Sequence, residues 1–224
     1  MSTSFVSVAV DGPVGAGKSS LARAAAKQLG YIYVDTGALY RAVGLYCKRN
    51  SIDIADGAAV QTALPEIRPE IRLADGVQHI FLNGEDVSEE IRLPEISMAA
   101  SAVSAIPAVR AALLDIQRDI AAENNVIMDG RDIGTVVLPD ATVKIFLTAK
   151  PEIRAKRRYD ELAAKGVSAT YEEVLSDLMT RDYNDTHRAA APLRQAEGAV
   201  TADTSQLDFT QSCELICNII KERV

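Results

Sequence analysis

Residues 6–20 read Val6-Ser7-Val8-Ala9-Val10-Asp11-Gly12-Pro13-Val14-Gly15-Ala16-Gly17-Lys18-Ser19-Ser20. The first five residues are mostly apolar and β-branched, which predicts a short buried strand, and residues 21–27 predict a helix. The glycine-rich turn between them fits the phosphate-loop pattern G-x-x-x-x-G-K-[ST], which begins at Gly12 and ends at Ser19. The stretch therefore predicts that a polyphosphate binds where the first strand meets the first helix.

The residue types of this loop match the chemistry of a bound polyphosphate. Glycines let the backbone approach closely, so that its N–H groups and the helix N-terminus point at the anion. Lys18 would contact the β- and γ-phosphates, and the Ser19 hydroxyl would hold Mg²⁺. Ser20 offers a second hydroxyl, although the pattern favours Ser19. A chance match is the alternative, and the flanking strand and helix argue against it.

Composition and charge limit the class of protein. The chain has 224 residues, 48% of them hydrophobic and 25% charged, which predicts one globular domain with room for a small insert. The net charge of −7 argues against a nucleic-acid-binding surface. It leaves room for a small anionic substrate, because arginines placed by the fold can form a local basic pocket.

Cysteine content and hydropathy predict a cytoplasmic protein that does not enter a membrane. Cys47, Cys213 and Cys217 are predicted to be buried, reduced thiols, because the two histidines are not spaced to complete a metal site. No apolar run approaches the roughly 18 residues that span a bilayer. No charged lead followed by an apolar segment opens the sequence.

Strands and helices alternate along most of the chain, which predicts a parallel sheet with helices on both faces. The further predicted strands are 31–34, 126–128, 143–147 and 199–202. The further predicted helices are 38–48, 107–123, 151–165, 171–187 and 208–222, with Thr36 as a possible cap. Ligands of such a sheet bind at the carboxyl ends of its strands.

One region departs from this alternation. Between residues 65 and 92, Asp75-Gly76 and Asn83-Gly84 separate short alternating runs, which predicts an antiparallel meander of three strands. A helix over 94–105 follows. We therefore expect a core of residues 1–62 and 106–224 and an inserted subdomain of residues 63–105.

Polar side chains follow the predicted strands at the carboxyl ends. Asp129-Gly130-Arg131-Asp132 comes directly after an apolar strand, which favours a function over a structural turn. Arg181, Asp185 and Arg188 share one helix face, where a surface ion-pair ladder is the alternative. Arg154, Arg157 and Arg158 lie on the preceding helix, where a solvated basic face is the alternative.

In combination these stretches resemble the bacterial cytidylate kinases, the (d)CMP kinase family of nucleoside monophosphate kinases. The resemblance is carried by Asp11–Ser19, Asp35-Thr36-Gly37-Ala38-Leu39-Tyr40-Arg41, Asp129–Val137, Val143–Leu147, and Arg181-Asp182 with Asp185, Arg188 and Ala191-Pro192-Leu193. It spans nearly the whole chain in order. It implies a phosphate-loop fold with a five-stranded parallel core, an antiparallel insert that binds the nucleoside monophosphate, and a short helical lid near residues 150–168.

The resemblance also implies two nucleotide sites. ATP is expected along Gly12, Pro13, Val14, Gly15, Ala16, Gly17, Lys18, Ser19 and Ser20. CMP is expected at Thr36, Arg41, Ser101, Arg110, Arg131, Asp132, Arg181, Asp185 and Arg188. Thr36 departs from the family, which often has serine there; threonine keeps the hydroxyl and adds a methyl group.

The chemistry of cytosine supports this assignment independently. An aspartate accepts a hydrogen bond from the exocyclic amine and an arginine donates to N3 and O2, so Asp132 and Arg110, helped by Ser101, form a plausible base site. Uracil would leave the aspartate unpaired. Arg41, Arg131 and Arg188 suit the monophosphate. Asp185 with Arg181 suits the sugar hydroxyls.

The predicted reaction is ATP plus CMP or dCMP giving ADP plus CDP or dCDP. No general base is needed, because the acceptor phosphate is largely ionised near neutral pH; His187 is a weaker alternative. Catalysis would rest on Mg²⁺, held by Ser19 and through water by Asp129, and on charge neutralisation. The candidate catalytic residues are Lys18, Arg131, Arg188, Arg154, Arg157 and Arg158. A structural cap is the alternative role of Asp129.

Two other functions fit parts of the sequence. A kinase for another nucleoside monophosphate, such as UMP, would share most of the motifs. A phosphate-loop switch or motor would need a water-positioning residue beside the metal carboxylate, whereas Asp129 is followed by Gly130. We expect the chain to act as a monomer on small nucleotides.

Overall fold

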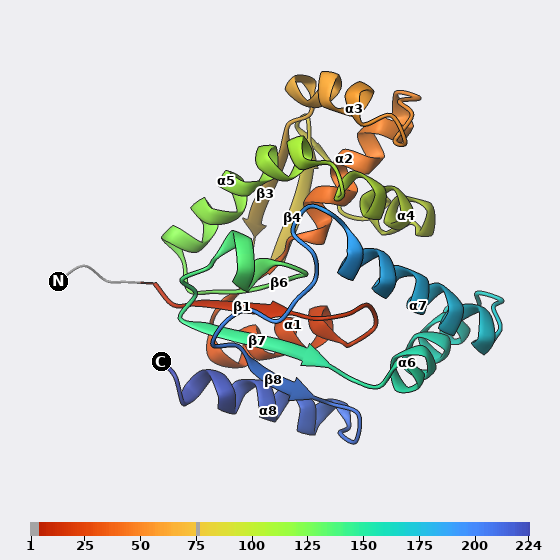
Figure 1. Cartoon of the computed structure of the whole chain (residues 1–224). Helices are drawn as coiled ribbons and strands as arrows, with labels where there is room; N and C mark the ends of the chain where they lie inside the picture. Colours follow the sequence, from red (N-terminus) through yellow and green to blue (C-terminus); the bar gives the residue numbers. More distant parts are fainter. Residues whose placement is uncertain (1–4, 75–76) are drawn as a thin grey trace.

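A parallel sheet with helices on both faces forms the core of the molecule. The computed structural model describes residues 5–74 and 77–224. Its main sheet has five parallel strands in the order β2-β6-β1-β7-β8. Figure 1 labels β6, β1, β7 and β8 of this sheet. The strands are β1 (Ser7–Asp11), β2 (Ile32–Asp35), β6 (Val126–Gly130), β7 (Val143–Thr148) and β8 (Val200–Asp203). The predicted five-stranded core is confirmed.

Alternating residues of the central strand β1 face two separate apolar layers. Val8 and Val10 pack with α1 (Lys18–Leu29) and α8 (Phe209–Lys221) on one face. Ala9 packs on the other face with Ala121 of α5 (Pro107–Glu123). This alternation follows from the two-residue period of a strand, and Figure 1 shows the two helical layers. The period places Asp11, at the end of β1, on the same face as Ala9.

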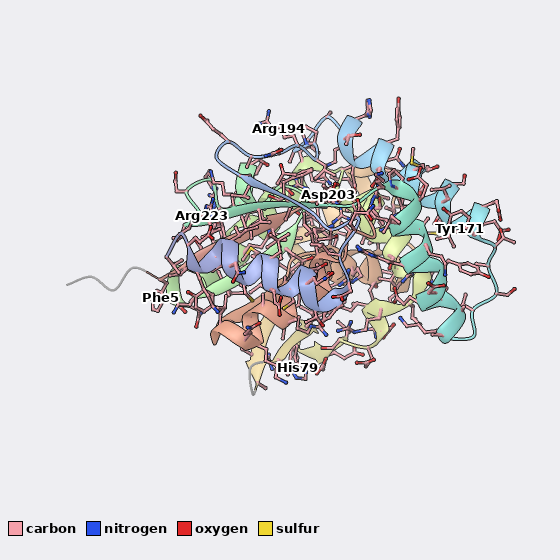
Figure 2. All side chains as sticks on the ribbon, turned by 90° about the horizontal axis from the view of Figure 1, so that it is seen from below. Phe5, His79, Tyr171, Arg194, Asp203 and Arg223 are labelled. Carbon is pink, nitrogen blue, oxygen red and sulfur yellow. The ribbon has the colours of Figure 1, made fainter. Side chains whose placement is uncertain are left out.

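The carboxyl ends of β1, β7 and β8 point towards a pair of helices, α6 (Pro151–Ala164) and α7 (Tyr171–His187) (Figure 1). Tyr171 marks this end of the molecule in Figure 2, and Phe5 and Arg223 lie at the opposite end. The helix pair therefore covers the edge of the sheet where ligands of parallel sheets bind.

The inserted region forms a second, antiparallel sheet of β3 (Pro69–Ala74), β4 (Val77–Leu82) and β5 (Glu85–Asp86). Asn83 and Gly84 both have positive φ, as a tight hairpin turn requires, so the turn predicted there is confirmed. The other predicted turn, Asp75-Gly76, lies outside the described residues. Helix α4 (Pro94–Val103) returns the chain to the core, close to the predicted helix.

A second apolar core joins this region to α2 (Gly37–Arg49). Leu39, Leu45, Ile80 and Ile91 are buried together in it. The predicted boundaries of the insert stay a prediction.

Four elements were not predicted from the sequence. Helix α3 (Gly57–Ala63) begins after Asp56, whose carboxylate accepts hydrogen bonds from the N–H groups of Ala58 and Ala59. This cap is a sequence signal that could have located the helix. Two 3₁₀ turns, Leu64–Glu66 and Glu90–Arg92, flank the small sheet. A π-helical turn, Ile133–Val137, follows β6.

The cysteines and the helices bear on two further predictions. Cys47, Cys213 and Cys217 are unpaired as predicted, although Cys213 is only half-buried. Among the described residues, no single helix has the length and apolar composition to cross a bilayer. One pair, Glu95–Val103 and Pro107–Glu123, meets those criteria only when joined across a 99° bend.

Candidate active site

The loop between β1 and α1 has the conformation that its glycines allow. A Cβ atom at Gly12 would lie 2.0 Å from the carbonyl oxygen of Leu147 in β7, so only glycine fits where these strands meet. Gly15 and Gly17 have φ of +73° and +86°, in the left-handed region that favours glycine. The loop therefore wraps closely around the N-terminus of α1, where partial positive charge is concentrated.

Lys18 is buried inside this loop. Its ammonium group donates to the carbonyl oxygens of Gly12 and Pro13, both at 2.7 Å. Burial, and then the neighbouring Arg131, lower the pKa of Lys18. A buried cation held by two neutral carbonyls is well placed to exchange them for anionic oxygens of a ligand.

Asp129 stands at the end of β6, beside the first turn of α1. Its carboxylate accepts from the Ser19 hydroxyl at 2.9 Å and from the Tyr33 hydroxyl at 2.8 Å. Burial, together with the nearby Asp35, raises the pKa of Asp129. Ser19, rather than Ser20, is thus the hydroxyl that lies against this carboxylate. Hydroxyl and carboxylate oxygens are the ligands that Mg²⁺ prefers, so the pair fits a magnesium ion. Within the described residues, no group of three His, Cys, Asp or Glu side chains is arranged to hold a metal.

Asp11 connects the start of the phosphate loop to the turn after β6. Its carboxylate accepts from the N–H groups of Ile133 and Gly134, both at 2.8 Å, and its side chain is buried. These bonds fix the start of the π-helical turn that follows Arg131 and Asp132. Burial raises the pKa of Asp11 from 3.8 to about 6, although the two N–H bonds oppose the rise.

The raised pKa of Asp11 predicts a pH-dependent stability that an Asp11→Asn variant lacks. Between pH 4 and 6 the folded protein holds this proton and the unfolded chain releases it, so the free energy of unfolding falls as the pH rises. A shift of this size corresponds to about 3 kcal/mol. Urea unfolding at pH 4 and pH 7 measures this difference. From pH 4 to pH 7, the free energy of unfolding of the wild type should fall by about that amount more than the free energy of unfolding of the variant. Parallel pH profiles for the two proteins would contradict the assignment, and exposed Asp140→Asn serves as the control.

Asp132 is the centre of an arginine–aspartate cluster next to this loop. We define the cluster by the residues Arg110, Arg131, Asp132, Arg181, Asp185 and Arg188. The buried Asp132 carboxylate accepts from Arg110 of α5, and Arg188 lies 3.5 Å away on its other oxygen. Burial, and then the proximity of Arg110, lower the pKa of Arg188. Arg110 and Asp132, which are predicted to contact the base, therefore lie side by side, and their role toward cytosine stays a prediction.

The second ion pair of the cluster joins two neighbouring elements. Arg131, after β6, donates from Nε to Asp185 of α7 at 2.7 Å. Among the ion pairs of the described residues, none includes Arg181. Burial, and then Arg131, lower the pKa of Arg181. The cluster holds more guanidinium groups than carboxylates, so it favours an anionic ligand.

Ser104, which was not predicted, contacts the cluster more directly than Ser101 does. Arg110 donates to the carbonyl oxygen of Ser104 at 3.2 Å, and Arg188 lies 3.5 Å from its hydroxyl. Ser101 is linked to it through its own carbonyl oxygen, which accepts from the Ser104 hydroxyl at 2.8 Å. Ser104 follows α4 in the short turn before Pro107, and no sequence pattern marked it.

Arg41 and Thr36 lie at the other side of β6. Arg41 of α2 pairs with Asp35 at 2.6 Å. Gln78 of β4 holds the backbone of Asp35 through its amide, accepting at 2.7 Å and donating at 3.2 Å. Thr36 occupies the cap position of α2 without making a cap bond, because its hydroxyl donates to the carbonyl oxygen of Asp129 at 2.8 Å. Thr36 is therefore the N-cap residue that the sequence indicated, but its side chain makes no capping hydrogen bond.

The three arginines of the predicted lid have different partners. Arg154 is buried and donates to the carbonyl oxygen of Val14 at 2.7 Å. Arg157 donates to the carbonyl oxygen of Thr204 at 2.7 Å, after β8. Arg158 pairs with Glu161 on the surface of α6 at 2.8 Å. The structure does not bring the three guanidinium groups together, because their positions on α6 face three different surroundings. A role for each on the phosphates stays a prediction.

The sequence as a whole matches one family. A family model described as cytidylate kinase matches residues 8–222. The chain belongs to the cytidylate kinase family. A cytidylate kinase from Caldicellulosiruptor bescii is 48% identical over 223 residues, which are 98% of this chain and 99% of that relative. One from Mycobacterium leprae is 48% identical over 217 residues, 96% of each chain.

One solved structure has a fold similar to that of this cytidylate kinase family member but a low sequence identity to it. It is an uncharacterised protein from Eubacterium ventriosum with a TM-score of 0.54 and 12% identity, and the match covers 97% of this chain and 99% of that one. This likeness concerns the fold alone. Family membership and the observed sheet order together confirm the phosphate-loop kinase fold.

Proposed function

We propose that this protein transfers the γ-phosphoryl group of ATP to CMP or dCMP, in line, to give ADP and CDP or dCDP. Family membership supports the reaction. The observation that carries it is the buried Asp132, which pairs with Arg110 beside the phosphate loop. No observation favours UMP as the acceptor.

Asp132 and Arg110 offer the acceptor and the donors that cytosine requires. The carboxylate accepts from the exocyclic amine, and the guanidinium donates to N3 and O2. Both side chains are nearly buried, with 7% and 11% of the side chain exposed, so an unmatched group there is not satisfied by water. Uracil presents a carbonyl oxygen to the carboxylate and is rejected for that reason.

The other members of the cluster, together with Arg41, are assigned to the phosphate and the sugar of CMP. Arg41, Arg131 and Arg188 hold the monophosphate, because guanidinium groups match phosphate oxygens in a planar fork. Asp185 with Arg181 holds the sugar hydroxyls. Thr36 and Ser101 complete the CMP site. The insert of residues 63–105 binds this nucleotide, and residues 150–168 form a lid over ATP.

Lys18 provides the main positive charge for the transferred group. When ATP binds, the ammonium exchanges the carbonyl oxygens of Gly12 and Pro13 for phosphate oxygens. A cation forms stronger hydrogen bonds with anionic oxygens than with neutral carbonyl oxygens. The acceptor phosphate has a second pKa of about 6 and is its own nucleophile, so no side chain abstracts a proton. Arg131 and Arg188 neutralise the acceptor phosphate as it approaches.

Mg²⁺ accompanies ATP in this proposal. Ser19 would hold the ion, and Asp129 would hold it through water. When bound, the ion neutralises negative charge on the phosphates. A monomeric state, a cytoplasmic location and the absence of nucleic-acid binding stay predictions.

An Asp185→Asn variant tests the sugar site. We expect kcat/KM with CMP to fall about tenfold, because Arg131 and a sugar hydroxyl both lose a charged partner. The loss should be smaller with dCMP, which lacks the 2′-hydroxyl. Steady-state assays with both nucleotides measure this, with exposed Asp177→Asn on the same helix as the control. An unchanged rate with both nucleotides would rule out the sugar site.

A panel of acceptors tests the proposed reaction itself. ADP release is followed with ATP, Mg²⁺ and each of CMP, dCMP, UMP, AMP and GMP. We expect kcat/KM for CMP and dCMP to exceed that for each other nucleotide by about 10²-fold or more, because the rejected bases leave a buried group unpaired. Equal rates with UMP would overturn the assignment of cytosine.

A further inference from the structure

The phosphate loop is held from outside by a carboxylate that the reaction does not use. The backbone N–H of Val14, in the middle of the loop, donates to Asp182 of α7 at 3.1 Å. The carbonyl oxygen of the same residue accepts from Arg154 of α6 at 2.7 Å. Arg154 and Asp182 are themselves paired at 2.7 Å. Both polar groups of Val14 are therefore held by one ion pair between two helices.

Arg154 is fixed in this position by its surroundings. Its Nε donates to the carbonyl oxygen of Ala149 at 2.8 Å, and only 5% of its side chain is exposed. The loop packs tightly here, since a Cβ atom at Gly15 would lie 3.1 Å from Leu178 of α7 and 3.3 Å from Cβ of Arg154. A guanidinium with three fixed acceptors leaves little freedom to the loop that it contacts.

The same helix also holds the arginine–aspartate cluster. Asp185, one turn beyond Asp182 on α7, accepts from Arg131 at 2.7 Å. Arg188 follows α7 and lies 3.5 Å from Asp132. Helix α7 is thus joined to the phosphate loop through Asp182 and to the arginine–aspartate cluster through Asp185 and Arg188.

We propose that Asp182 is a positioning residue that joins the phosphate loop to α7. In this way it fixes the position of the loop relative to the arginine–aspartate cluster. This inference rests on the proposed function for its assignment of the two sites. Asp182 acts through Arg154 and the Val14 peptide, and it contacts neither nucleotide. Without it the loop samples other conformations and must be ordered when ATP binds, which weakens ATP binding selectively.

The test compares Asp182→Ala with Asp160→Ala. Alanine has a high helix propensity, and it removes the contacts of Asp182 with the Val14 N–H group and with Arg154. Asp160 is an exposed aspartate on α6 that pairs with Lys156 on the same helix, so it matches the change away from the loop. For Asp182→Ala we expect the KM for ATP to rise about tenfold, with the KM for CMP changed by less than about twofold. Asp160→Ala should change neither by more than about twofold.

A binding measurement without turnover accompanies the kinetics. The dissociation constant of ADP, measured by titration calorimetry, should rise with the KM for ATP. An unchanged KM for ATP, or an equal rise in both KM values, would overturn the inference, because a merely structural role does not separate the two nucleotides. If wild type bound ADP but did not phosphorylate CMP, the proposed function would fail while the ADP titration still tested Asp182.

A second variant covers a failure of Asp182→Ala to fold. Arg154→Lys keeps a positive charge beside Asp182, but one ammonium cannot replace a guanidinium that contacts Val14, Ala149 and Asp182 together. The same selective rise in the KM for ATP is expected. A KM for ATP within about twofold of wild type in this variant would also overturn the inference.

Discussion

Replacing Lys18 with methionine should lower kcat by about 10³-fold or more. The ammonium is the buried cation of the phosphate loop, and it stabilises charge that spreads over the transferred phosphoryl group. Removal of a single uncharged donor at such a position costs about 10²–10³-fold, and Lys18 carries a full charge. Steady-state assays at saturating ATP and CMP measure the loss.

The Lys18→Met variant should still fold. Burial lowers the pKa of Lys18, so its charge is disfavoured in the folded state and an apolar side chain of similar length is tolerated. Circular dichroism and urea unfolding check this. Lys27→Met, an exposed change near the end of the same helix, should leave kcat within about twofold. A kcat for Lys18→Met within about tenfold of wild type would refute the phosphate-loop assignment.

Replacing Asp132 with asparagine should lower kcat/KM for CMP by about 10²–10³-fold. The amide removes the charge that pairs with Arg110 and Arg188, and it turns an N–H₂ group towards the exocyclic amine of cytosine. The KM for ATP should change by less than about threefold, because Asp132 lies outside the phosphate loop. Assays that vary each nucleotide at saturation of the other separate the two effects.

We also expect the Asp132→Asn variant to change its preference between CMP and UMP as acceptors. An asparagine amide can donate to the carbonyl oxygen that uracil carries in place of the cytosine amine, so the ratio of UMP to CMP use should rise. Exposed Asp140→Asn should leave both rates within about twofold of wild type. Equal losses for ATP and CMP, with an unchanged ratio of UMP to CMP, would show that Asp132 does not contact the base.

Local patterns predicted the elements more reliably than the contacts between them. Residues 6–27 predicted a strand, a tight turn and a helix, because the apolar run, the glycines and the helix formers each limit their own backbone. The Asn83-Gly84 hairpin followed for the same reason, since both residues accept positive φ. Helix α3 and the π-helical turn at 133–137 were missed, because segments of 7 and 5 residues are too short to show an apolar period.

The contacts of the site lie between residues far apart in the sequence. Ser19 and Asp129 are separated by 110 positions, Asp11 and Gly134 by 123, and Val14 and Asp182 by 168. Arg154 shows why the sequence could not specify them. Its spacing relative to Arg157 and Arg158 gives a helix face, but the packing of α6 against the phosphate loop decides which carbonyl each guanidinium meets.

The sequence by itself determined the phosphate loop, the parallel sheet and the set of arginines and aspartates at its carboxyl edge, because backbone geometry and periodicity are local properties. The sequence predicted that Arg110 and Asp132 act on the same base, but only the tertiary structure decided that they form an ion pair. It also decided the pairing of Arg131 with Asp185 and of Asp182 with Val14. Those pairings depend on how α5, α6 and α7 pack over the sheet. No spacing along a single element carries that information.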